Sequence, residues 1–299
     1  RHHVTHIFAV PMLWHTIEKQ VRAEAAKLGE KETQKLQKAL KFSTALQNVF
    51  PYWGADVSKH LLRRVTDKLF GPSVMFCVSG GSYLRPSAME LLNGIGYCLH
   101  NGYGMSEIGI TSVELRSRPK YRNQNTIGRP FQSVEYRLDE QGCLQVRGSS
   151  LCARKLVNGQ EQTLEGWFDT GDKMCCKDGY YTILGRQGDV VIGENGENIN
   201  PDTVENRFTL DGAKQLCVLG IDDAQGQHLG LVVQVSPYIT AESIGNIKNQ
   251  AYAINDTLPT AMAVKGLIST AKPTRLPSRL TIIRARARAT ILLIIITFS

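Results

Sequence analysis

The sequence contains no cysteine pair with the C-x-x-C spacing of structural zinc sites and redox motifs. Its seven cysteines are scattered over 299 residues and are odd in number. We interpret them as free thiols in a reducing cytosol, which excludes a disulfide framework and predicts a cytoplasmic protein. The start of the chain also lacks the apolar core of a signal peptide.

No apolar run is long enough to span a bilayer. The candidate is Ile291–Ile296, which has six residues where about 20 are needed. With the basic stretch before it, this run forms an atypical tail, residues 284–299. Three interpretations of the tail are open: a terminal strand, a tail from a non-native reading frame, or a contact with a membrane surface. We favour the first two, so membrane contact is not expected.

An excess of positive charge is absent from the body of the chain, although the net charge is +8. Residues 265–299 contain seven basic and no acidic residues, which leaves 28 basic and 27 acidic residues in 1–264, or a net charge of +1. A neutral body offers no general basic face for phosphate backbones, so we expect no nucleic-acid partner.

The chain also lacks an initiating methionine. Arg1 is followed almost at once by residues 5–11, an apolar segment typical of a buried strand. We therefore expect that the natural N-terminal part of the protein lies outside this sequence.

Helical and strand patterns alternate over the first 125 residues, which predicts an α/β layer. The segments with helical periodicity or helix-start signals are 15–41, 57–70 and 86–92, and the short apolar runs predicted as strands are 5–10, 73–78 and 97–100. In such layers ligands bind at the loops beyond the carboxyl ends of the strands. Two glycine-containing loops are predicted there, residues 79–82 and 101–104.

Strand alternation dominates from about residue 126. Two hairpins are predicted, one around residues 139–142 and one around 177–179, so that residues 126–185 form a β-rich subdomain. After Gly188 a smaller α/β unit follows. Its predicted helices lie near 201–208 and 241–254, and its predicted strands at 216–221 and 229–235.

The glycine loops and the polar residues after them suit a nucleotide. Glycine permits close approach of backbone to phosphates, and the Tyr103 ring offers a stacking surface for adenine. Glu107 is a hard oxygen ligand for Mg²⁺, and Asp172 can accept hydrogen bonds from a ribose diol. Arg186 can reach ribose or phosphate. Taken singly, each has a plainer interpretation as a turn, a packed aromatic, or a solvated surface charge.

Four segments in this order decide between the interpretations. Asn101–Glu107, Gly166–Asp172, Gly185–Asp189 and Gly196–Pro201 resemble the later core motifs of the adenylate-forming superfamily, and residues 79–86 resemble its adenine-side loop. The resemblance covers roughly residues 4–283. Gly196–Pro201 makes it closest to the fatty or aryl acyl-CoA synthetases.

The resemblance implies an α/β fold in two parts. Residues 1–187 correspond to the later part of a large adenylation domain, with α/β layers and the β-rich subdomain, and residues 188–283 to a small, hinged α+β domain. The implied reaction joins a carboxylic acid to ATP as an acyl-adenylate, with Mg²⁺, and then transfers the acyl group to the thiol of coenzyme A. An acyl carrier protein is the alternative acceptor.

The resemblance also implies roles for individual residues. Glu107 binds Mg²⁺ and, with Arg186, is catalytic, whereas Gly188 is the hinge between the two parts. The residues implied in nucleotide binding are Gly80, Gly81, Asn101, Gly102, Tyr103, Gly104, Met105, Ser106, Asp172 and Arg186.

Two features of the family are not found in the sequence. One is the Ser/Thr/Gly-rich phosphate loop with its lysine, and the other is a lysine near the C-terminus, where residues 277–284 contain Arg279 and no lysine. The sequence beyond Ile283 does not resemble the family. We therefore predict that this chain does not activate a carboxylate by itself. A non-catalytic nucleotide-binding remnant is the alternative from another functional class.

Overall fold

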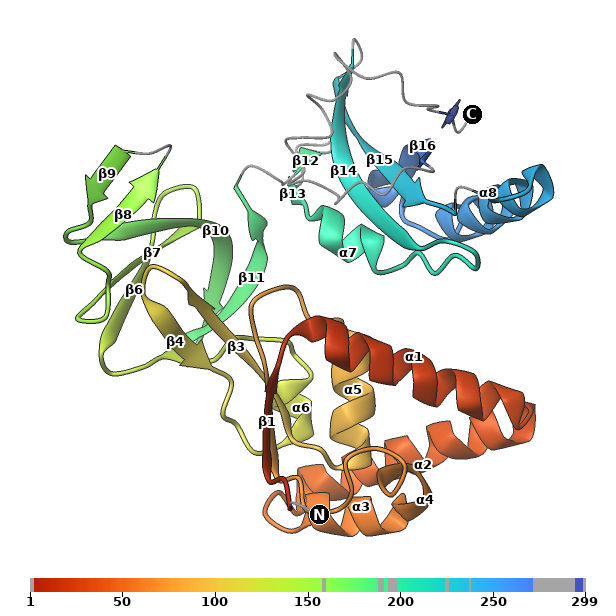
Figure 1. Ribbon diagram of the computed structural model, residues 1–299. Coiled ribbons are helices and arrows are strands. Elements are labelled where there is room, and N and C mark those ends of the chain that lie inside the picture. The colour runs from red at the N-terminus through yellow and green to blue at the C-terminus, as the bar shows by residue number, and fades with distance from the viewer. Residues whose placement is uncertain are drawn as a thin grey trace. The chain divides into compact units, whose positions relative to one another are not determined.

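The computed structural model describes residues 3–157, 160–187, 191–192, 198–223, 226–236, 238–270 and 294–297. The chain divides into two units, Arg1–Ile183 and Leu184–Ser299, which are described separately (Figure 1). Among the described residues, no helix has the length and apolar character needed to cross a membrane.

A five-stranded sheet lies at the centre of the first unit. Its strands, in spatial order, are β1 (His6–Ala9), β2 (Phe76–Ser79), β3 (Leu99–Met105), β4 (Gly109–Val113) and β5 (Arg129–Pro130). β1 and β2 pair in parallel, as do β2 and the first residues of β3. From Gly102 onward, β3 pairs antiparallel with β4. The predicted parallel α/β arrangement is thus confirmed for β1, β2 and the start of β3.

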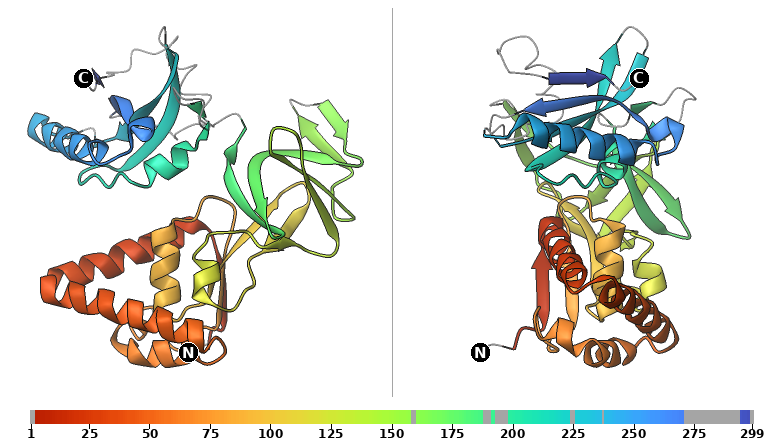
Figure 2. Two further views of the ribbon diagram at one scale, coloured as in Figure 1. Left: turned by 180° about the vertical axis from the view of Figure 1, so that it is seen from behind. Right: turned by 90° about the vertical axis from the view of Figure 1, so that its right-hand side faces the viewer.

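Helices pack on one side of this sheet (Figure 2). They are α1 (Pro11–Lys27), α2 (Glu30–Val49), α3 (Gly54–Leu61), α4 (Arg63–Thr66), α5 (Pro86–Ile95) and α6 (Pro119–Arg122). Proline in the first turn favours the start of α1, α5 and α6, because its missing N–H has no partner there in any helix. Trp14, Leu92 and Leu99 are fully buried in the core between helices and sheet.

Two helix predictions are corrected by the structure. The segment 15–41 belongs to two helices separated at Gly29, and the segment 57–70 to two short helices separated at Leu62. Val57, the first residue of that predicted segment, is 41% exposed, whereas Val65 and Leu69 pack against the core. The buried face of α3 instead carries Ser58 and Lys59, whose polar atoms bond to α2 and to the carbonyls of Pro72 and Val74.

The β-rich subdomain contains the two predicted hairpins. β6 (Val134–Leu138) pairs antiparallel with β7 (Cys143–Gly148), and the sheet order is β11-β10-β7-β6, with β10 at Phe168–Lys177 and β11 at Tyr180–Arg186. A further hairpin, β8 (Arg154–Val157) with β9 (Gln160–Thr163), was not predicted. The core of the subdomain contains Leu144 and Val146, and it includes Tyr103 and Ile108 from the segment around β3.

The second unit contains a four-stranded sheet in the order β14-β15-β16-β17. Its elements are β12 (Val191–Ile192), β13 (Asn198–Ile199), α7 (Pro201–Glu205), β14 (Gln215–Asp223), β15 (Gly226–Gln234), α8 (Ala241–Asn255), the 3₁₀ helix η1 (Thr260–Met262), β16 (Val264–Thr270) and β17 (Ile294–Thr297). The predicted helices and strands of this unit are present. In the tail, the expected terminal strand is observed as β17, antiparallel to β16.

Candidate functional site

The loop after β2 lies against β3. Ser79, the last residue of β2, is the register partner of Asn101 in β3. A Cβ added at Gly80 would lie 3.4 Å from the carbonyl oxygen of Gly102, so the two backbones are close at this point. Gly81 has a φ of +89°, which side chains rarely adopt, and open space beside it. The structure therefore brings together the two predicted glycine segments.

The second of these segments is not a loop, which corrects the prediction for residues 101–104. Asn101–Gly104 lies within β3, whose register with β4 shifts between Tyr103 and Gly104. A Cβ at Gly104 would overlap the carbonyl oxygen of Gly109 and would lie 2.7 Å from the Cα of Ile110. Gly104 is therefore required for close strand pairing, a role that spacing alone does not distinguish from contact with a ligand.

Tyr103 and Asp172, which are 69 residues apart, are in direct contact. The Tyr103 hydroxyl donates to Oδ2 of Asp172 at 2.6 Å, and both residues are more than 90% buried. Burial raises the pKa of the Tyr103 hydroxyl, and the adjacent Asp172 carboxylate raises it further. The backbone N–H of Asp172 donates to Oγ1 of Thr170, whose hydroxyl donates to the Leu144 carbonyl. These bonds fix the Asp172 carboxylate on β10 beside β3.

Met105, Ser106 and Glu107 lead into the turn between β3 and β4. Ser106 is exposed and Glu107 is partly exposed. The backbone N–H of Cys152 donates to the Glu107 carbonyl at 2.7 Å, which holds this turn against the β-rich subdomain.

The described residues contain no cluster of three or more His, Cys, Asp or Glu side chains able to hold a metal. Mg²⁺ in nucleotide sites is commonly held by one or two carboxylates together with substrate phosphates. The single Glu107 carboxylate fits that kind of site, in which the ion arrives with the nucleotide.

Arg186 is exposed at the end of β11 and belongs to the second unit. Its predicted place beside Asp172 therefore stays a prediction. Gly188 and Gly196 lie outside the described residues, as does the window 277–284. Asn200, from the same glycine-punctuated segment, caps α7 through a side-chain bond to the N–H of Asp202.

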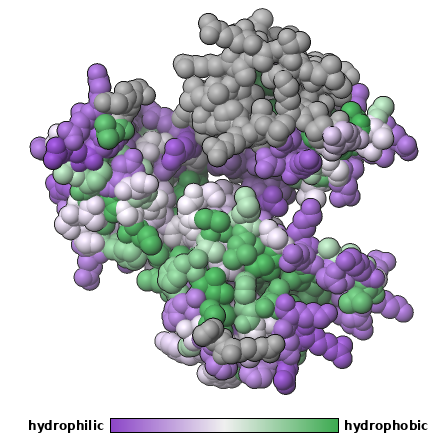
Figure 3. All heavy atoms as spheres, viewed as in Figure 1, coloured by the Kyte–Doolittle hydropathy of each residue, from purple (hydrophilic) through white to green (hydrophobic). Residues whose placement is uncertain are grey.

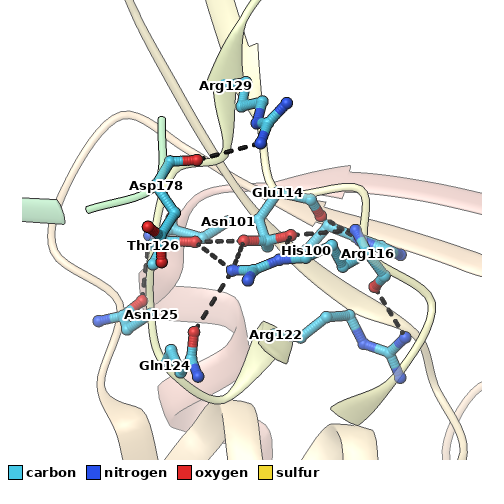
Figure 4. A network of polar contacts seen from close by, with 10 residues as sticks. All are labelled: His100, Asn101, Glu114, Arg116, Arg122, Gln124, Asn125, Thr126, Arg129 and Asp178. Carbon is cyan, nitrogen blue, oxygen red and sulfur yellow. Dashed lines mark hydrogen bonds and ion pairs between the residues drawn. The ribbon is translucent and has the colours of Figure 1, made fainter. Parts of the chain in front are cut away.

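The sequence analysis missed a buried polar network next to β3 (Figure 4). Glu114 is 0% exposed and accepts three hydrogen bonds from Arg116, two from the guanidinium at 2.8 and 2.5 Å and one from the backbone N–H at 3.0 Å. The Thr126 hydroxyl donates a fourth. The Arg116 guanidinium also lies over the ring of Tyr180, 3.7 Å from its centroid. His100 contacts the Glu114 carbonyl through Nδ1 at 2.5 Å. The signal available in the sequence was the acidic Glu114 placed directly between the apolar residues Val113 and Leu115.

Asn101 connects this region to the glycine loop. Its Nδ2 donates to Oδ1 of Asn125 at 3.0 Å, and Asn125 donates in turn to the carbonyl of Leu84. Asn101 is thus a buried bridge between β3 and the loop 80–85.

Comparison with known proteins shows which family this chain matches. A family model described as AMP-binding enzyme matches residues 1–154, just over half of the chain. A long-chain-fatty-acid–CoA ligase of Mycobacterium bovis is 27% identical over 186 residues, which cover 60% of this chain and 30% of that protein. A 2-succinylbenzoate–CoA ligase of Lactococcus lactis is 26% identical over 198 residues, which cover 64% of this chain and 43% of that protein.

Solved structures share the fold. O-succinylbenzoate coenzyme A synthetase from Bacillus subtilis, in complex with AMP, matches with a TM-score of 0.57 at 16% identity, covering 92% of this chain and 49% of that one. The shared architecture is a mixed α/β fold with several sheets. The chain spans less than half the length of these proteins.

Proposed function

The chain belongs to the family of AMP-binding enzymes, and from this premise we propose that it is the later part of an AMP-forming acyl-CoA synthetase. The proposed substrate is a carboxylic acid of the fatty or aryl class. Its carboxylate attacks the α-phosphate of ATP and pyrophosphate leaves. The thiol of coenzyme A then attacks the acyl carbon, and AMP leaves.

The contact between Tyr103 and Asp172, beside the loop of Gly80 and Gly81, is the observation that carries this proposal. A ribose diol needs a fixed acceptor, and Asp172 is held on β10 by backbone and side-chain bonds. The adenine needs a flat surface, for which we propose the Tyr103 ring. Glycine at 80 and 81 leaves the backbone open to the nucleotide. The proposed nucleotide-binding segment of β3 and the turn after it is completed by Gly102, Gly104, Met105 and Ser106.

The remaining roles are proposed from the family. Glu107 would hold Mg²⁺, which neutralises phosphate charge when bound. Arg186 would contact ribose or phosphate, and Gly188 would be the hinge of a small domain that comprises residues 188–283. This domain would rotate between the two half-reactions. We propose a cytoplasmic location because the cysteine pattern is that of free thiols.

This chain alone is expected to bind AMP without turning over. The matched relatives are more than twice as long as the matched segments, and no phosphate-binding loop with a lysine is found in the sequence. Isothermal titration calorimetry with AMP tests the expected binding. A pyrophosphate assay with ATP and a fatty acid tests the expected lack of turnover. We expect AMP binding that Asp172→Ala weakens about tenfold, because a hydrogen bond to a charged group is lost. Robust pyrophosphate release by the chain alone, or no AMP binding, contradicts the proposal.

Two alternatives make different predictions. A ligase that loads a carrier protein would transfer the acyl group to phosphopantetheinylated carrier and not to coenzyme A. A non-catalytic remnant, favoured by the absence of lysine in 277–284, would bind AMP and remain inactive even after the preceding half of a related enzyme is supplied.

A further inference from the structure

The peptide group between Leu84 and Arg85 is held on both sides by side chains distant in sequence. Its carbonyl oxygen, on Leu84, accepts from Nδ2 of Asn125 at 2.9 Å. Its N–H, on Arg85, donates to Nε2 of His15 at 3.0 Å. His15 lies on α1, and Asn125 follows α6. This peptide ends the loop that begins with Gly80 and Gly81, one residue before Pro86 opens α5.

Asn125 is suited to this contact by its backbone as well as its amide. Its φ is +57°, a conformation that asparagine tolerates better than most other residues. Its Oδ1 accepts from Nδ2 of Asn101, in β3. One amide therefore links the strand that carries Tyr103 to the far end of the glycine loop.

His15 acts here as an acceptor, which requires a neutral ring with its proton on Nδ1. Burial, together with the nearby Arg85 charge, lowers the pKa of His15 to about 4. The ring therefore remains neutral, and the acceptor remains available, throughout the neutral pH range.

At the glycine end of the same loop, Gly80 lies close to the Gly102 carbonyl, whereas Gly81 has open space beside it. Gly81 has a φ of +89° and no atom within 4 Å of where a Cβ would be. Glycine also has the largest backbone freedom to lose on ordering. Gly81 is therefore held from two sides, by Ser79 and Gly80 at the end of β2 and by the far end of the loop, where the Leu84 side chain is 1% exposed and the Leu84–Arg85 peptide is clamped.

We propose that His15 and Asn125 are positioning residues that clamp the Leu84–Arg85 peptide and thereby preorganise the Gly80–Gly81 loop for the nucleotide. The proposal rests on the proposed function, because it assumes that AMP binds at this loop. A loop that is ordered beforehand loses less entropy on binding, so the clamp increases affinity without touching the ligand.

Two conservative variants test the clamp in the full chain. Asn125→Asp keeps the acceptor for Asn101 and tolerates the positive φ, but cannot donate to the Leu84 carbonyl. His15→Leu removes the acceptor, whereas His15→Gln restores one. His60→Leu is the matched control, because His60 is exposed and its ring contacts only the Asp56 carbonyl of its own helix among the bonds described.

Amide hydrogen exchange of residues 80–85 and calorimetric titration with AMP are the two measurements. We expect faster exchange at the Arg85 amide in His15→Leu and about tenfold weaker AMP binding in His15→Leu and Asn125→Asp. His15→Gln should restore most of the slow exchange at the Arg85 amide and most of the affinity for AMP. His60→Leu should match the unaltered chain in both measurements.

The outcomes separate the two proposals. If the unaltered chain does not bind AMP, the proposed function is overturned, while exchange at Arg85 still decides whether the clamp orders the loop. If exchange rises in the variants but AMP affinity does not change, the clamp is purely structural and the positioning role is wrong. Unchanged exchange in His15→Leu and in Asn125→Asp overturns the clamp itself.

Discussion

Two ion pairs of the first unit differ sharply in their exposure to water. The Glu114 side chain is 0% exposed in its pair with Arg116, whereas Glu135 and Arg147 are both largely exposed in theirs. Removing one partner of a buried pair leaves an uncompensated charge and costs about 3–5 kcal/mol, whereas exposed pairs contribute about 0–1 kcal/mol. Glu114 is therefore expected to stabilise the fold and Glu135 is not.

Glu114→Gln should lower the free energy of unfolding by about 3 kcal/mol, because Arg116 then lacks its carboxylate partner. The matched control, Glu135→Gln, should change it by less than about 1 kcal/mol. Urea denaturation of both variants measures the difference. Equal effects of the two substitutions would show that Arg116 finds compensation from its other contacts, Tyr180 and Gln124.

The pH dependence of the same variants follows from the Glu114 carboxyl. Burial alone would raise its pKa, but the hydrogen bonds from Arg116 and Thr126 outweigh burial and hold the pKa below its ordinary value of 4.5. A lowered pKa in the folded state stabilises the fold above the unfolded-state pKa, and this stability is lost as the pH falls through the folded-state pKa. Between pH 5 and acid pH, the unaltered chain should thus lose more stability than Glu114→Gln.

The residues of the candidate site were predicted with uneven success. Motif resemblance selected Tyr103 and Asp172, which are in contact although 69 residues separate them. It could not select His15, Asn125 or Glu114, because each acts through hydrogen bonds to backbone groups or to partners at irregular spacings. Such contacts leave no periodic trace in a single sequence.

At the scale of the element, β3 combines two pairing modes in seven residues. It is parallel to β2 up to Asn101 and antiparallel to β4 from Gly102, with a register shift after Tyr103. The sequence predicted the strand but ended it too early, because its glycines are typical of loops. The helix around residues 57–70 was predicted as one element and is two, so its regular apolar spacing faces the core only in part. Val65 and Leu69 pack against the core, whereas Val57 is exposed.

Gly104→Ala should destabilise the first unit by about 3 kcal/mol or more, because the new Cβ overlaps the backbone of β4. Gly109→Ala is the control on the same hairpin. Its φ is +78° with open space beside it, so we expect only the backbone cost of about 1–2 kcal/mol. Thermal unfolding of the two variants compares these costs. A smaller loss for Gly104→Ala than for Gly109→Ala would mean that β3 and β4 separate easily.

At the scale of the whole chain, the described helices of the first unit lie on one side of its sheet (Figure 2). Ile7 and Ala9 of β1 pack against the core beneath the helices. Phe8 lies between them and is 67% exposed, and Met75, which directly precedes β2, is 63% exposed. Figure 3 shows hydrophobic side chains gathered on the surface of this unit. Parallel sheets are almost always covered on both faces, and β1 is also an edge strand.

We expect this chain, when isolated, to associate with itself through the exposed apolar surface around Phe8. Phe8→Glu should shift the chain toward monomer, because it places a charge on the apolar surface next to the β1 edge. Tyr238→Glu is the matched control, since Tyr238 is 94% exposed and belongs to the second unit. Sedimentation velocity over a range of concentrations measures the association. If Phe8→Glu associates as strongly as Tyr238→Glu, the face around β1 is not the contact surface, and the exposed aromatic residues around Trp53 become the next surface to test.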